Sequence, residues 1–197
     1  MTARIARRAG AAAGLVVLAA CQNTLSPCDI PRPAGQVAAA SWMTDCTASL
    51  EPTSFAALPG GSASYSGYVT GQFAPAAGST DTLVGDAVLT VAFGAASNAV
   101  SGTLGNFTAS SGGALGGTLS VSSGPLIDNA GKAVFFASIS GTLTGYGGSD
   151  TVTFATGGGG GLLGDAAQGI TLVSSGTATM GSGYVDNNAG LAVVGLR

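Results

Sequence analysis

The sequence predicts an all-β protein: a small eight-stranded antiparallel up-and-down barrel, preceded by a signal peptide and an irregular, proline-containing leader. Three observations predict this fold. Apolar and polar residues alternate with a period of two in many segments after residue 62, as in strands with one buried face. Glycine occupies 34 of the 197 positions, and charged residues make up only 8% of the chain. Turn-forming residues separate the alternating segments, as between antiparallel strands.

The clearest strand pattern is 83–93, where Ala87, Leu89 and Val91 share one face. The eight expected strands are 64–73, 83–93, 99–108, 115–121, 133–143, 150–155, 168–179 and 190–197. Eight antiparallel strands at this spacing favour a closed barrel, which also removes exposed strand edges. A β-sandwich is the alternative, although glycines inside strands, such as Gly102, suit the curvature of a barrel better.

The N-terminus predicts export. Residues 1–8 contain three arginines and no acid, and residues 9–20 form an apolar stretch of twelve that ends at Cys21. A basic start followed by a short apolar core is typical of a secretory signal peptide, and the stretch is too short to span a bilayer. We therefore expect residues 1–20 to be a signal peptide.

The four residues Leu18-Ala19-Ala20-Cys21 resemble the lipobox of bacterial lipoproteins. The resemblance implies cleavage before Cys21, a diacylglyceryl group on its thiol and acylation, for example by palmitate, of its new amine. Two or three acyl chains anchor a protein stably where one does not. Gln22 stands where lipoproteins of the inner membrane carry Asp, which favours the outer membrane. An ordinary signal peptide with an accidental cysteine is the alternative.

Removal of residues 1–20 leaves three basic residues against nine acidic ones, a net charge of −6. An acidic surface disfavours nucleic acid as a partner and disfavours electrostatic attachment to anionic lipid. We therefore expect the acyl chains to provide the attachment to the membrane.

The leader between Cys21 and residue 61 differs from the rest of the chain, because it holds five of the seven prolines and the single tryptophan. We expect a tether and a short helix around residues 34–40. Cys28 and Cys46 lie in an oxidising compartment if the chain is exported, so a disulfide between them is expected. It would hold residues 28–46 as a compact unit close to the barrel; two free thiols are the alternative. The expected domains are therefore 1–20, 21–61 and 62–197.

Few residues are suited to catalysis. The absence of histidine excludes a Ser-His-Asp triad and histidine metal ligands. The run Gly157–Gly161 lacks the following Gly-Lys-Ser/Thr of a phosphate-binding loop, so we expect a flexible loop there. Six acids lie at or near strand ends: Asp81, Asp86, Asp128, Asp150, Asp165 and Asp186. We expect solvated loop acids rather than a glycosidase-like or calcium-binding pair, and hence no enzyme, no metal and no cofactor.

Three segments carry a further resemblance. Leu83–Phe93 followed by Val100–Leu104 resembles the paired strands that open a transferrin-binding-protein-B-like β-barrel. Gly164–Gln168 is similar to a turn before a late strand of that barrel, and Gly190–Arg197 resembles its closing strand. The resemblance spans roughly residues 62–197 and implies a single barrel of that lipoprotein family.

Together these patterns predict an outer-membrane-anchored lipoprotein of the bacterial cell envelope, facing the periplasm or the cell surface. Its barrel would act as a binding or accessory module for a protein or small ligand, presented by loops on a rigid scaffold. The alternative is a structural or integral outer-membrane barrel. Short strands near 115–121 and 150–155 and the few aromatic residues, seven Phe, four Tyr and one Trp, argue against that alternative.

Overall fold

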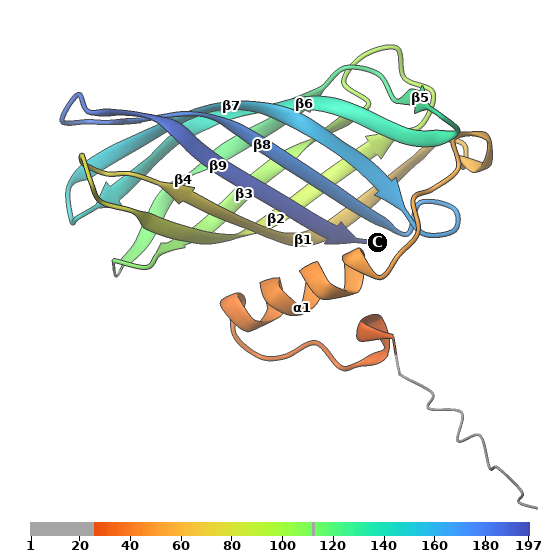
Figure 1. Ribbon diagram of the computed structural model, residues 1–197, viewed down its shortest axis with the longest axis horizontal. Coiled ribbons are helices and arrows are strands. Elements are labelled where there is room, and N and C mark those ends of the chain that lie inside the picture. The colour runs from red at the N-terminus through yellow and green to blue at the C-terminus, as the bar shows by residue number, and fades with distance from the viewer. Residues whose placement is uncertain (1–25, 112) are drawn as a thin grey trace, which may run out of the picture.

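The computed structural model describes residues 26–111 and 113–197, so the predicted signal peptide and Cys21 lie outside the described residues. Eight long strands, antiparallel throughout, form a closed barrel (Figure 1). The barrel strands are β1 (Ser62–Phe73), β2 (Asp81–Ala92), β3 (Val100–Ala109), β4 (Gly113–Ser123), β6 (Lys132–Tyr146), β7 (Asp150–Leu163), β8 (Gly169–Met180) and β9 (Val185–Leu196). The predicted fold class is confirmed, and the sandwich alternative is wrong.

Chain order and spatial order agree around the barrel, and β9 pairs with β1 to close it. A short additional strand, β5 (Ile127–Asn129), forms a hairpin with the start of β6 and lies outside the ring, because β4 pairs directly with β6. Each of the eight predicted segments overlaps one barrel strand.

The largest departure from expectation is strand β7, which continues through Gly157–Gly161 to Leu163. A flexible loop was predicted there, because the run of glycines lacks the rest of a phosphate-binding motif. The neighbouring strand supplies the missing side chain: Phe135 pairs with Gly160, and its ring lies 2.5 Å from where a Cβ of Gly160 would stand. An aromatic ring that covers a glycine across the sheet stabilises the strand in its place.

Apolar side chains fill the barrel interior. The largest of them are aromatic and almost fully buried: Tyr65, Phe73, Phe107, Phe135 and Phe154. The outward positions carry mainly Ser, Thr, Gly and Ala; Thr118, Thr142 and Thr153, for example, form one exposed cross-strand row on β4, β6 and β7. The barrel is therefore apolar inside and hydroxyl-rich outside.

The leader contains two short 3-10 helices, η1 (Pro27–Asp29) and η2 (Phe55–Ala57), and the helix α1 (Gln36–Ala48). The helix begins later and runs longer than the one predicted at 34–40. Gly35 precedes its first turn with a positive φ of 90°, and small or apolar residues continue its buried side to Met43 and Cys46. These residues pack on the outside of the barrel, and this packing sustains the helix beyond its alanine-rich start.

Residues 50–58 close one end of the barrel, although the whole stretch was predicted to belong to the free tether. The backbone N–H of Thr53 donates to the carbonyl of Leu162 at 2.8 Å, and the carbonyl of Thr53 accepts from the N–H of Ala133 at 3.0 Å. Phe55 and Leu58 pack against the interior core. The chain therefore links α1 to β1 by a path held against β6 and β7.

Candidate functional site

The helix α1 is joined to η1 near its end and to the barrel near its start. A disulfide joins Cys28 of η1 to Cys46 of α1, with their Cα atoms 4.7 Å apart. At the start of α1, Gln36 Nε2 donates to Asp86 Oδ1 of β2 and to the carbonyl of Asn106, both at 3.0 Å. The predicted compact unit of residues 28–46 is therefore present and lies against the barrel.

A small second apolar cluster lies between α1 and the outer face of the barrel. Its centre is Tyr68 of β1, which is only 2% exposed although it points outward. Ala39, Ala40 and Met43 of α1 pack around it, and the Arg32 guanidinium lies over the Tyr68 ring, 4.7 Å from its centroid. Two alanines in succession on the buried side let the helix approach the strands closely.

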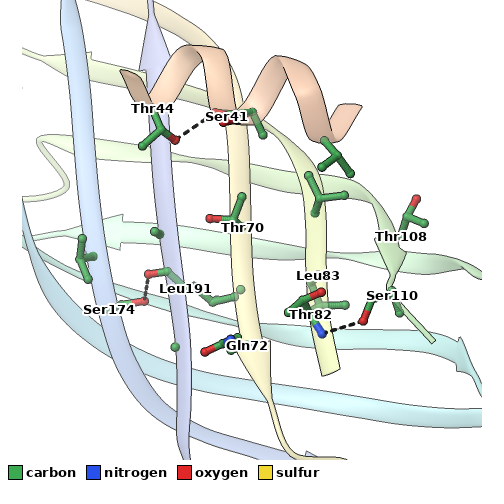
Figure 2. A pocket seen from close by; sticks show the side chains of 18 residues that line it. Ser41, Thr44, Thr70, Gln72, Thr82, Leu83, Thr108, Ser110, Ser174 and Leu191 are labelled. Atoms are coloured by element: carbon green, nitrogen blue, oxygen red, sulfur yellow. Dashed lines mark hydrogen bonds between the residues drawn. The ribbon is translucent and has the colours of Figure 1, made fainter. Parts of the chain in front are cut away.

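Beside this cluster, α1 overhangs the barrel and forms a groove of about 650 Å³, here called the α1 groove (Figure 2). Its wall is Val37, Ala40, Ser41 and Thr44 of α1. Its floor is a row of outward residues paired across four strands: Val173 of β8, Ala192 of β9, Thr70 of β1 and Val84 of β2. Residues at the end of β3 complete the far side.

The α1 groove is uncharged. Each of its lining residues is apolar, a hydroxyl residue, a glycine or the amide Gln72. Two of its apolar side chains are largely open to solvent, with Val37 70% and Val173 62% exposed. Burial of such apolar surface against a ligand lowers the free energy. The groove therefore suits an uncharged and mainly apolar ligand.

A second hollow, of about 590 Å³, lies on the outside of β4, β6 and β7 around Phe136. The Phe136 ring is 66% exposed and covers Gly159 of the neighbouring strand. None of the residues that line this hollow belongs to a helix. The α1 groove, which has a helical wall, is the better formed of the two.

One predicted loop acid is instead a buried structural group. Asp81, at the start of β2, is 3% exposed. Its carboxylate accepts hydrogen bonds from the hydroxyls of Ser110, Ser111 and Tyr146, the last at 2.8 Å, and from the N–H of Thr82 at 2.7 Å. Burial alone would raise the pKa of Asp81, but these hydrogen bonds outweigh it and lower the pKa from 3.8 to about 2.

Asp81→Asn should lower the free energy of unfolding at neutral pH by about 1–3 kcal/mol, because charge-assisted hydrogen bonds to a buried group are lost. The folded pKa lies below the unfolded value of 3.8, so this stabilisation is complete above about pH 4 and is lost as the pH falls towards 2. Urea unfolding at neutral pH and between pH 4 and 2 measures both effects. Asp128→Asn, at an exposed position of the short strand β5, is the control for stability at neutral pH. An Asp81→Asn deficit that persists unchanged at pH 2 would contradict the assignment.

Two other predicted loop acids, Asp186 and Asp86, also accept hydrogen bonds. Asp186 of β9 is buried and accepts from the backbone N–H groups of Ala74, at 2.7 Å, and Asn188, at 2.9 Å. Asp86 accepts from Gln36 and from the side chain of Asn106. Each of these three carboxylates, Asp81 included, thus has its own set of donors.

The lipidation site Cys21 lies outside the described residues, whereas the predicted disulfide partners Cys28 and Cys46 are joined. Within residues 26–111 and 113–197, no helix has the length and apolar character needed to cross a bilayer. The groove residues were not identified from the sequence, because a row such as Thr70 and Ala192 looks like any outward strand face. The available signal was the pair Cys28 and Cys46, which predicts a closed leader loop but not where that loop packs on the barrel.

Neither the family models nor the curated proteins with which the chain was compared give a match.

Proposed function

We propose that this chain is a lipoprotein anchored to the bacterial outer membrane through Cys21, whose water-exposed β-barrel serves as a binding or accessory module. Its ligand site in this proposal is the α1 groove. The resemblance to transferrin-binding-protein-B-like barrels supports this assignment through the fold, since a single eight-stranded barrel occupies residues 62–196.

The observation that carries the proposal is the polarity of the barrel. A membrane-spanning barrel presents an apolar band to lipid and a polar lumen to water. This barrel has the opposite arrangement, with an aromatic and aliphatic interior and rows of hydroxyl residues outside, such as Thr118, Thr142 and Thr153. The polarity favours a barrel in water over the alternative of an integral barrel. The argument from short strands is wrong, since β4 has 11 residues and β7 has 14.

The ligand site proposed here lies on the side of the barrel, whereas it was expected in the loops from the sequence. Several connections between strands are short, such as Gly147–Ser149 between β6 and β7 and residues 110–112 between β3 and β4. Short turns offer little area for recognition. The α1 groove is concave, and its volume falls within the roughly 300–1,000 Å³ range of small-molecule sites.

Two measurements test the anchor and the barrel separately. In bacteria fed labelled palmitate, the full-length chain should take up label, and the full-length Cys21→Ser variant should not. The chain from residue 21 onward with Cys21→Ser should remain in the aqueous fraction without detergent. Uptake of label by the variant would show that Cys21 is not the lipidation site. Sedimentation of the shortened chain as an integral membrane protein would show that the barrel is not water-exposed.

A further inference from the structure

We infer that the α1 groove holds one acyl chain of the protein's own lipid anchor. The inference rests on the proposed lipidation of Cys21. In this arrangement one chain of the anchor lies between α1 and the barrel, and the remaining chain or chains stay available to the membrane.

The volume and the lining of the groove suit an acyl chain. A palmitoyl chain has 16 carbons. If each carbon occupies about 30 Å³, the volume of one water molecule in the liquid, the chain needs about 500 Å³. The groove offers about 650 Å³. Val173, Ala192 and Val84 of its floor and Val37 of its wall provide apolar contacts, and Thr70 lies between Ala192 and Val84 in the floor row.

The uncharged lining of the groove favours an acyl chain with a neutral head group. A free fatty acid brings a carboxylate and a phospholipid brings a phosphate, and either charged group needs a cation as well as hydrogen bonds when it leaves water. The groove lining contains no Lys or Arg. An acyl chain already joined through an ester or amide has a neutral head, for which hydroxyls such as Ser41 and the Gln72 amide are adequate partners.

The length of the leader places the anchor within reach. The described chain begins at Ser26, five residues after Cys21, and five residues extend to at most about 18 Å. The Cys28–Cys46 disulfide holds the start of the described leader beside the end of α1. Thr44, at the near end of the groove wall, is two residues from Cys46, or about 3 Å along the helix axis. Cys21 can therefore place an attached chain at the groove.

A photoreactive fatty acid tests the inference in the intact lipoprotein. Bacteria that express the full-length chain are fed a diazirine analogue of palmitic acid, irradiated, and the protein is digested for mass spectrometry. The expected product is an intramolecular crosslink from the Cys21 lipopeptide to α1 between Val37 and Thr44, or to β8 and β9 near Val173 and Ala192. The mass of each adduct identifies the source of the chain.

Two tryptophan variants provide the matched comparison. Ala192→Trp fills the floor of the groove and should reduce the intramolecular crosslink at least tenfold. Ser140→Trp puts the same side chain on the exposed outer face of β6, away from the groove, and should leave the crosslink unchanged. Both variants are checked by thermal unfolding, so that a loss of crosslink is compared between folded proteins.

The remaining outcomes are distinguishable. Adducts in the groove with the mass of a phospholipid would show that a membrane lipid is the occupant and would overturn the inference. A labelled Cys21 that crosslinks only to lipid, or to the barrel outside the groove, would also overturn it while the proposed anchor stands. An unlabelled Cys21 would overturn both the anchor and the inference.

Discussion

Gly158→Ala should destabilise the barrel by about 3 kcal/mol or more, at or above the upper end of overpacking costs, because the added methyl group meets rigid backbone. A Cβ at Gly158 would lie 1.9 Å from the carbonyl oxygen of Val173 and 2.6 Å from the Cα of Ser174. Both atoms belong to the backbone of β8, so no side chain can rotate away. The two strands must separate locally, and hydrogen bonds between β7 and β8 are lost. Urea unfolding of the two proteins measures the difference.

The neighbouring position supplies the control. At Gly159 the nearest atoms to an added Cβ belong to the Phe136 ring, at 3.6 Å, which is an ordinary van der Waals contact. Gly159→Ala should therefore change the free energy of unfolding by less than about 1 kcal/mol, with a small gain from the reduced entropy of the unfolded chain. Equal losses at Gly158 and Gly159 would show that the run tolerates no side chain at all, and would contradict the close approach of β7 and β8.

This pair of glycines explains the main failure of the sequence-based prediction. The strands with alternating apolar residues were predictable, because burial of one face requires that period. In the run Gly157–Gly161 there are no side chains to alternate, and the information lies in the partners. Phe135 on β6 fills the space over Gly160, and the β8 backbone fills the space over Gly158. A partner strand is not visible in the local sequence, so a strand was mistaken for a loop.

The candidate sites also differ in how far the sequence could predict them. The disulfide was predictable, because only Cys28 and Cys46 remain once Cys21 is assigned to the lipid. The Asp81 network was not predicted, although its signal exists: in an up-and-down barrel the start of β2, the end of β3 and the end of β6 lie at one end, which gathers Asp81, Ser110 and Tyr146. The α1 groove was not predictable, because its position depends on where α1 packs around the barrel.

Removal of the Cys28–Cys46 disulfide should release α1 from the barrel without unfolding the barrel. The bridge closes a nineteen-residue loop, which in the chain-entropy model contributes about 3 kcal/mol. This contribution acts on the docked leader, while the strands keep their own core of Tyr65, Phe135 and their neighbours. Amide hydrogens of α1 should therefore exchange about 100-fold faster in the Cys28→Ala/Cys46→Ala double variant, and those of β6 should be unchanged.

The single tryptophan gives an independent measurement of the same event. Trp42 lies on α1, half-buried against the cluster around Tyr68, and no residue in the described part of the chain accepts a hydrogen bond from its Nε1. Docking therefore holds the indole ring by apolar contact alone, and release to water should shift its emission to longer wavelength.

The oxidised wild type, unfolded without a reducing agent, should show no free thiol, because Cys28 and Cys46 are paired and the proposed lipidation occupies the thiol of Cys21. If the double variant keeps the emission and exchange rates of the wild type, then the contacts of Gln36, Arg32 and the apolar cluster suffice to hold the helix, and the disulfide has another role. If α1 is released, the wall of the α1 groove is lost with it. The Cys21 crosslink should then fall in the double variant although the floor of the groove, at Val173 and Ala192, is intact.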